Sequence, residues 1–125
     1  MRVAVIIACL ASAGCTTPAY VPATTKKILT AAEISLVKEG IRDVLNYPDS
    51  AMFGKIAASR NTAGKVYVCG DVSLRSGLGG YTGRTPFMGM MVNVRGQKTF
   101  KATGMGGTEY ETDSVTTLCR RYGVI

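Results

Sequence analysis

Four cysteines are the most reactive side chains of this 125-residue chain, which contains no histidine. A thiol becomes a nucleophile when a base or a cation beside it lowers its pKa, and histidine most often serves as that base. Its absence excludes a Ser-His-Asp triad, a Cys-His pair and an imidazole metal site. The cysteines also lack the Cys-x-x-Cys spacing of redox pairs. The composition therefore favours a protein that is not an enzyme and holds no cofactor.

Two other patterns resemble catalytic or metal sites, and both have a simpler interpretation. Ser35 and Lys38 fit the Ser-x-x-Lys pattern of penicillin-interacting enzymes, but the companion motifs are missing and the chain is too short. Glu109, Glu111 and Asp113 alternate, so in an extended segment they would share one face, as a calcium site or a general acid requires. Charges on the solvated edge of a sheet explain this alternation more simply. We therefore predict no catalytic and no metal-binding residues.

The glycine-rich stretch at residues 76–83 is the most unusual part of the chain. It lacks the Gly-Lys-Ser/Thr end of a phosphate loop, and a strand follows it where a dinucleotide fingerprint needs a helix. Two interpretations remain open: a long hairpin connection, or a binding loop with an aromatic tip between two arginines. The residues of this candidate binding loop are Arg75, Gly79, Gly80, Tyr81 and Arg84.

The first residues of the chain have the pattern of an export signal. Arg2 supplies a positive charge, and residues 3–13 are an uninterrupted run of small and apolar side chains. As a helix this run would be about 16 Å long, against about 30 Å for the hydrocarbon core of a bilayer. It is too short to span a membrane but has the length of a signal-peptide core. We expect residues 1–14 to be a lipoprotein-type signal peptide.

Cys15 follows three small residues and resembles the acceptor cysteine of a bacterial lipobox. We predict that Cys15 is lipidated, although Ser12 stands where a lipobox usually has leucine. Residues 15–29 would then form a tether, since residues 16–25 carry two prolines, four threonines and no charge. Threonine and not aspartate follows the cysteine, so we expect a periplasm-facing anchor in the outer membrane. Ordinary signal cleavage nearby is the alternative, and it would leave a soluble periplasmic protein.

Processing would leave two thiols, Cys69 and Cys119, because Cys9 lies within the signal and Cys15 is the lipid site. In an oxidising compartment such a pair most simply forms a disulfide. In the chain-entropy model, closing a loop of this length stabilises a domain by about 4 kcal/mol. A redox pair is the alternative, but nothing obvious would lower a thiolate pKa.

Helices are predicted near both ends of the mature chain. Thr30 and Glu33 have the spacing of a capping box, and apolar residues at helical spacing continue from there to Leu45. Asp113 would cap a short final helix at residues 114–122.

The folded part, residues 30–125, is predicted to be a single α+β domain. Its central strand alternates Val66, Val68 and Val72 with Cys69 on the other face. We expect a small antiparallel sheet with both helices on one of its faces. The predicted strands are residues 53–59, 65–72, 87–94 and 98–103, with a tight turn at 95–97 and a glycine-rich connection at 103–108.

Four short motifs follow one another in the middle of the chain. They are Tyr-Pro-Asp-Ser-Ala-Met-Phe at residues 47–53, Val-Cys-Gly-Asp-Val at 68–72, Gly-Gly-Tyr-Thr-Gly at 79–83 and Pro-Phe at 86–87. In this combination the chain resembles a family of small exported proteins and lipoproteins of proteobacteria and their phages, over residues 41–94. The resemblance implies a helix, a PDSA-x-F turn, a VCG-x-V strand, a GGY-x-G loop and a further strand. It supports the domain and the disulfide and implies no catalytic role.

The charge of the chain is dispersed. Loss of Arg2 with the signal leaves 14 of the 15 basic residues against 8 acidic ones, a net charge of +6. Because no run of Lys and Arg exceeds two residues, we predict no nucleic-acid partner. The charge fits solubility and weak affinity for anionic lipids and peptidoglycan carboxylates.

Together these features predict a lipid-anchored periplasmic binding or structural domain of the bacterial cell envelope. Its lipid would contact the membrane, and its glycine-rich loop would hold an envelope protein or peptidoglycan. The alternative is a small secreted inhibitor of a cell-wall hydrolase such as lysozyme, which would insert the same loop into the enzyme's cleft. Lysozymes are themselves basic, so a net charge of +6 disfavours this alternative.

Overall fold

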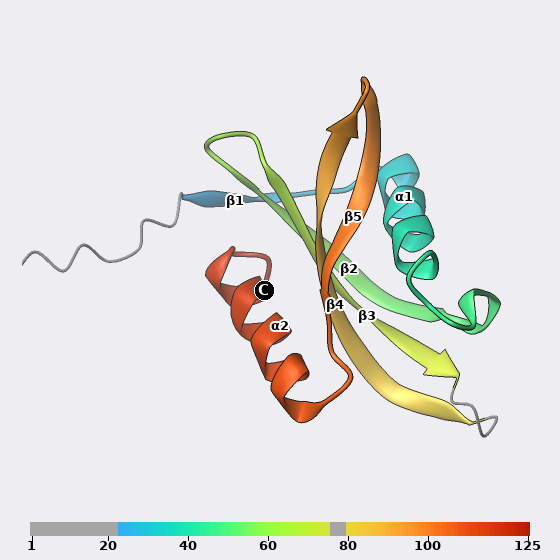
Figure 1. Ribbon diagram of the computed structural model, residues 1–125. Coiled ribbons are helices and arrows are strands. Elements are labelled where there is room, and N and C mark those ends of the chain that lie inside the picture. The colour runs from blue at the N-terminus through green and yellow to red at the C-terminus, as the bar shows by residue number, and fades with distance from the viewer. Residues whose placement is uncertain (1–22, 76–79) are drawn as a thin grey trace, which may run out of the picture.

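The computed structural model describes residues 23–75 and 80–125 (Figure 1). The expected signal peptide, Cys15 and most of the expected tether lie outside these residues, as does Gly79. In chain order the elements are β1 (Thr24–Lys27), α1 (Ala31–Arg42), the 3-10 turn η1 (Pro48–Ser50), β2 (Met52–Asn61), β3 (Val66–Arg75), β4 (Tyr81–Val94), β5 (Gln97–Met105) and α2 (Glu109–Arg121).

The five strands form one antiparallel sheet in the order β1-β2-β3-β4-β5, so each strand lies beside its neighbour in sequence. The turn between β4 and β5 contains Arg95 and Gly96 at φ of 52° and 81°. Two successive left-handed residues of this kind match the right-handed twist of a hairpin. The predicted α+β class, with an antiparallel sheet, an N-terminal helix and a C-terminal helix, is confirmed.

The two helices cover opposite faces of the sheet (Figure 1), so the prediction that both lie on one face is wrong. Val37 of α1 packs in one cluster with Val68 of β3. Val115 of α2 packs in a second cluster with Cys69, the next residue of the same strand. Successive side chains of a strand point to opposite faces, so Val68 and Cys69 make β3 apolar on both sides. A helix must therefore pack against each face of the sheet.

The α1 face holds an aromatic core around Phe87, which is fully buried. Its ring makes edge contacts with Phe53 and Phe100, at centroid distances of 6.2 and 6.5 Å. Phe87 lies opposite Gly70 in the β3–β4 register, and a Cβ on Gly70 would stand 2.6 Å from Cζ of the ring. Glycine is therefore required at this position, because any side chain would occupy the space of the ring.

The start of α1 is confirmed and its predicted end is too late. The hydroxyl oxygen of Thr30 accepts a hydrogen bond from the Glu33 N–H, and the Glu33 carboxylate accepts one from the Thr30 N–H. The helix ends at Arg42, before Leu45, and the η1 turn that begins at Pro48 follows. A residue before proline resists the helical conformation, so the chain must leave the helix ahead of this turn.

The final helix begins earlier than predicted, at Glu109, because Thr108 and not Asp113 is its N-cap. Thr108 and Glu111 form a capping box of the same kind as that of α1. Glu109, Glu111 and Asp113 are therefore helical and do not alternate along an extended segment. The first two lie in the first turn, where the positive end of the helix dipole stabilises carboxylates.

The strands extend beyond their predicted bounds. β4 begins at Tyr81, well before residue 87, and β5 continues to Met105 into the glycine-rich connection. β1 was not predicted, since its four residues, Thr24–Lys27, are polar and lie within the expected tether. They form a strand because they pair with the end of β2, from Thr24 opposite Asn61 to Lys27 opposite Ala58.

Glu33 links α1 to both edge strands. Its two carboxylate oxygens lie 3.4 Å from the ammonium groups of Lys27 and Lys98. Burial alone would raise the pKa of this carboxyl. The hydrogen bond from the Thr30 N–H and the charges of the two lysines outweigh burial and hold the pKa below its ordinary value.

Replacing Glu33 by Gln is expected to lower the free energy of unfolding by about 1 kcal/mol at neutral pH, because the amide loses both ion pairs. Since the folded pKa lies below the unfolded one, the carboxylate's contribution is complete above its ordinary pKa of 4.5 and is lost as the pH falls through the folded value. Urea unfolding between about pH 7 and pH 2 measures this. A difference between wild type and variant that stays constant over this range would contradict the assignment.

Candidate functional site

The candidate binding loop is the turn of the β3–β4 hairpin. Arg75, the last residue of β3, lies opposite Tyr81, the first residue of β4. A Cβ on Gly80 or on Gly83 would meet nothing within 4 Å, so close packing does not require these glycines. The two strands on either side pair as a hairpin, residues 76–79 lie outside the described residues, and a binding role for the loop stays a prediction.

The two arginines that flank the loop do not meet on one face. Nη1 of Arg84 lies 3.7 Å from Oδ2 of Asp71, on the α2 face of the sheet. The register of the hairpin shifts between Ser73 and Arg75, as at a β-bulge, and Arg75 lines hollows beside η1. Bulges commonly re-aim a side chain in this way. Arg75 and Arg84 therefore belong to different surfaces.

Arg75 lies among exposed apolar side chains at the hairpin end of the molecule. It lines one hollow of about 500 Å³ with Tyr47 and η1, and another of about 320 Å³ with Tyr47 and Val44. Met52 lies at the same end of the sheet but points to the α2 face, because its neighbour Phe53 packs in the α1 cluster. Val44 and Tyr47 are 59% and 56% exposed. We call Val44, Tyr47 and Arg75 the hairpin-end surface.

The apolar members of the hairpin-end surface were missed from the sequence. Val44 continues the helical spacing of Val37 and Ile41, which predicts a place on the buried side of the helix. In the structure α1 ends at Arg42 and Val44 turns outward. An apolar residue just beyond a helix end and ahead of proline is the signal that could have revealed it. Tyr and Arg are enriched among the residues that dominate protein interfaces.

The chain enters the sheet at the end opposite to this surface. Thr24 of β1 lies beside Asn61, the last residue of β2, whereas Met52 is the first residue of β2. Nine residue steps of extended chain separate the two ends of this strand, a distance of about 30 Å. Figure 1 shows β1 entering on the left and the β3–β4 hairpin at the lower right.

The remaining predicted site residues, Cys69 and Cys119, form a disulfide that joins β3 to α2. Both are almost fully buried, with 4% and 3% of their surface exposed. A buried disulfide offers no thiolate, so these residues serve the fold. Within residues 23–75 and 80–125, no group of three or more acidic, histidine or cysteine side chains could hold a metal ion.

Comparison with protein-family models, with curated proteins and with solved structures finds no match to this chain. In the part of the chain that the structure describes, no helix is both long enough and apolar enough to cross a membrane.

Proposed function

We propose that this chain is a lipid-anchored, periplasm-facing domain of the bacterial cell envelope that binds a partner and catalyses no reaction. The hairpin-end surface carries this proposal. It gathers exposed apolar side chains around one arginine, at the end of the sheet farthest from the chain entry at Thr24.

This geometry suits an anchored binding domain. If Cys15 holds the lipid, the residues before Thr24 span at most about 30 Å when extended. The sheet then adds about 30 Å between Thr24 and Met52. The hairpin-end surface would point away from the membrane and toward partners in the periplasm.

The chemistry of the surface favours an envelope protein over peptidoglycan as the partner. Val44 and Tyr47 offer apolar area that gains free energy when another apolar surface covers it. A glycan strand presents mainly hydroxyl groups and would leave this area in contact with polar groups. Arg75 can add a charge-assisted hydrogen bond to a carboxylate of the same protein.

The test is capture of envelope proteins by the purified domain, in parallel with a Tyr47→Ala/Arg75→Ala variant. Loss of both side chains is expected to weaken capture at least tenfold, because a single hot-spot residue contributes about 2 kcal/mol or more. Tyr110→Ala is the matched control, since Tyr110 is 81% exposed on α2, outside the hairpin-end surface. Equal recovery of the same proteins by wild type and double variant would contradict the proposal.

A further inference from the structure

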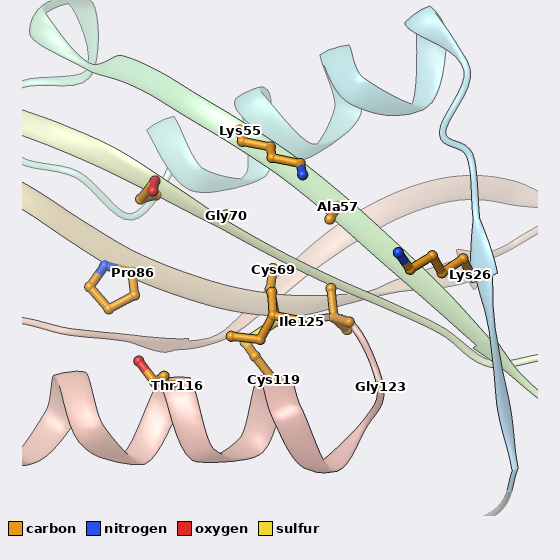
Figure 2. A pocket seen from close by; sticks show the side chains of 12 residues that line it. Lys26, Lys55, Ala57, Cys69, Gly70, Pro86, Thr116, Cys119, Gly123 and Ile125 are labelled. Carbon is orange, nitrogen blue, oxygen red and sulfur yellow. A yellow bond between two sulfur atoms is a disulfide. The ribbon is translucent and has the colours of Figure 1, made fainter.

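A groove of about 550 Å³ lies on the α2 face, between the β1–β2 edge of the sheet and the end of α2 (Figure 2). Its volume is in the range of about 300–1,000 Å³ that is usual for small-molecule sites. The groove is distinct from the hairpin-end surface, because none of the three residues of that surface lines it.

The floor of the groove is apolar. Figure 2 shows the Cys69–Cys119 disulfide beneath it, with Pro86 toward one end. Ala57 of β2 and Val124, which follows α2, add to this floor, and Ile125 lies over the disulfide (Figure 2). Val124 is 5% exposed and packs in the same cluster as the disulfide, so the floor belongs to the core of the domain.

Two lysines stand over this apolar floor. Lys26 of β1 and Lys55 of β2 reach toward each other on either side of Ala57 (Figure 2). Neither ammonium group has an ion pair with another residue among those described, whereas the adjacent Lys27 is paired with Glu33. Asp71 supplies the one side-chain carboxylate among the described residues that line the groove. Its Oδ2 lies 3.7 Å from Nη1 of Arg84, and its buried Oδ1 has no hydrogen-bond partner in the part of the chain that the structure describes. The groove therefore combines an apolar floor with two unpaired positive charges.

We propose that this groove binds the carboxylate of a fatty acid, with the head group between Lys26 and Lys55 and the acyl chain along the disulfide. The proposal concerns a second site and is independent of the partner of the hairpin-end surface. A carboxylate between two ammonium groups gains charge-assisted hydrogen bonds, and the acyl chain gains from leaving water.

An acyl chain fits the groove better than a peptide does. Each residue of a bound peptide brings an N–H and a C=O that need partners when they leave water. Apart from the charged residues, only Thr116 offers a polar side chain among the described residues that line the groove. An acyl chain has no polar group to satisfy beyond its carboxylate.

Calorimetric titration of the purified domain with decanoate, below the concentration at which it forms micelles, tests the proposal. Lys26→Glu/Lys55→Glu is expected to weaken decanoate binding at least tenfold. Lys65→Glu/Lys101→Glu changes the net charge equally at exposed lysines that do not line the groove, and it should change affinity less than twofold. Lys26→Gln/Lys55→Gln, which adds no negative charge, should weaken binding in the same direction and serves if the first variant does not fold.

Ligand variants identify the chemistry that is recognised. Decanol and decylamine should each bind at least tenfold more weakly than decanoate, and a free-carboxylate apolar tripeptide should also bind more weakly. Octanoate should bind more weakly by about fourfold for each methylene lost from a fully buried chain. The proposal is overturned if the Lys26/Lys55 variants bind decanoate as the control variant does, or if decylamine or the tripeptide binds as tightly as decanoate.

Discussion

Replacing Cys69 and Cys119 together by Ala is expected to lower the free energy of unfolding by about 3–4 kcal/mol. The bond joins residues 50 apart in sequence, so the unfolded chain without it gains the conformational freedom of a large loop. Domains of this kind are commonly stable by only about 5–15 kcal/mol, so the variant should lose a large part of its stability.

Urea unfolding of wild type and of the double variant measures this loss. Wild type measured with a thiol reductant should match the double variant, because both then lack the bond and keep the fold. Unfolding midpoints that coincide for oxidised wild type and variant would show that the bond does not stabilise the domain. The variant should also fray first at α2, which the disulfide joins to β3.

Replacing Phe87 by Ala is the second large effect, with an expected loss of about 3–5 kcal/mol. Phe87 is fully buried between Phe53 and Phe100, and the space above Gly70 is shaped for its ring. The surrounding strands are paired on both sides, so they cannot move inward to fill the cavity. The loss should therefore lie near the upper part of this range.

Thermal and urea unfolding measure the Phe87→Ala effect. Tyr110→Ala is the control, because Tyr110 is 81% exposed and its loss should change stability by less than about 0.5 kcal/mol. Similar stabilities for the two variants would contradict the assignment of Phe87 to the centre of the core.

Most of the fold could be predicted because the decisive interactions are local or alternate regularly. The Thr30–Glu33 capping box and the strand alternation around Cys69 depend on neighbours in sequence, and both are confirmed. Taken together, the alternation of β3 and the disulfide predict that the two helices lie on opposite faces of the sheet. The disulfide from Cys69 places α2 on one face of the sheet. The apolar side chain of Val68 points to the other face, so a second element must bury it, and α1 does so.

The rest depended on contacts between distant segments. β1 has no apolar pattern and exists through its pairing with residues 58–61 of β2. The hairpin-end surface joins Tyr47 to Arg75, which are brought together only when β2 and β3 pair. No local pattern in the sequence predicts either contact.

The motifs in the middle of the chain are explained largely by packing. In Val-Cys-Gly-Asp-Val, Val68 and Val72 face the α1 core, Cys69 forms the disulfide and Gly70 makes room for Phe87. Packing does not explain Tyr47, the exposed first residue of the motif at residues 47–53. Tyr47 is 56% exposed and belongs to neither core cluster, which is consistent with a role in binding.

The proposed function places the partner at the hairpin end of the domain, away from the expected lipid anchor. A photo-crosslinking amino acid placed at position 47 in living cells tests this most directly. The control is position 94, which is also about half exposed but lies at the opposite end of β4 from the hairpin. We predict that position 47 crosslinks to one envelope protein and that position 94 does not. Crosslinking to the same protein from position 94 alone, or equally from both positions, would contradict the claim.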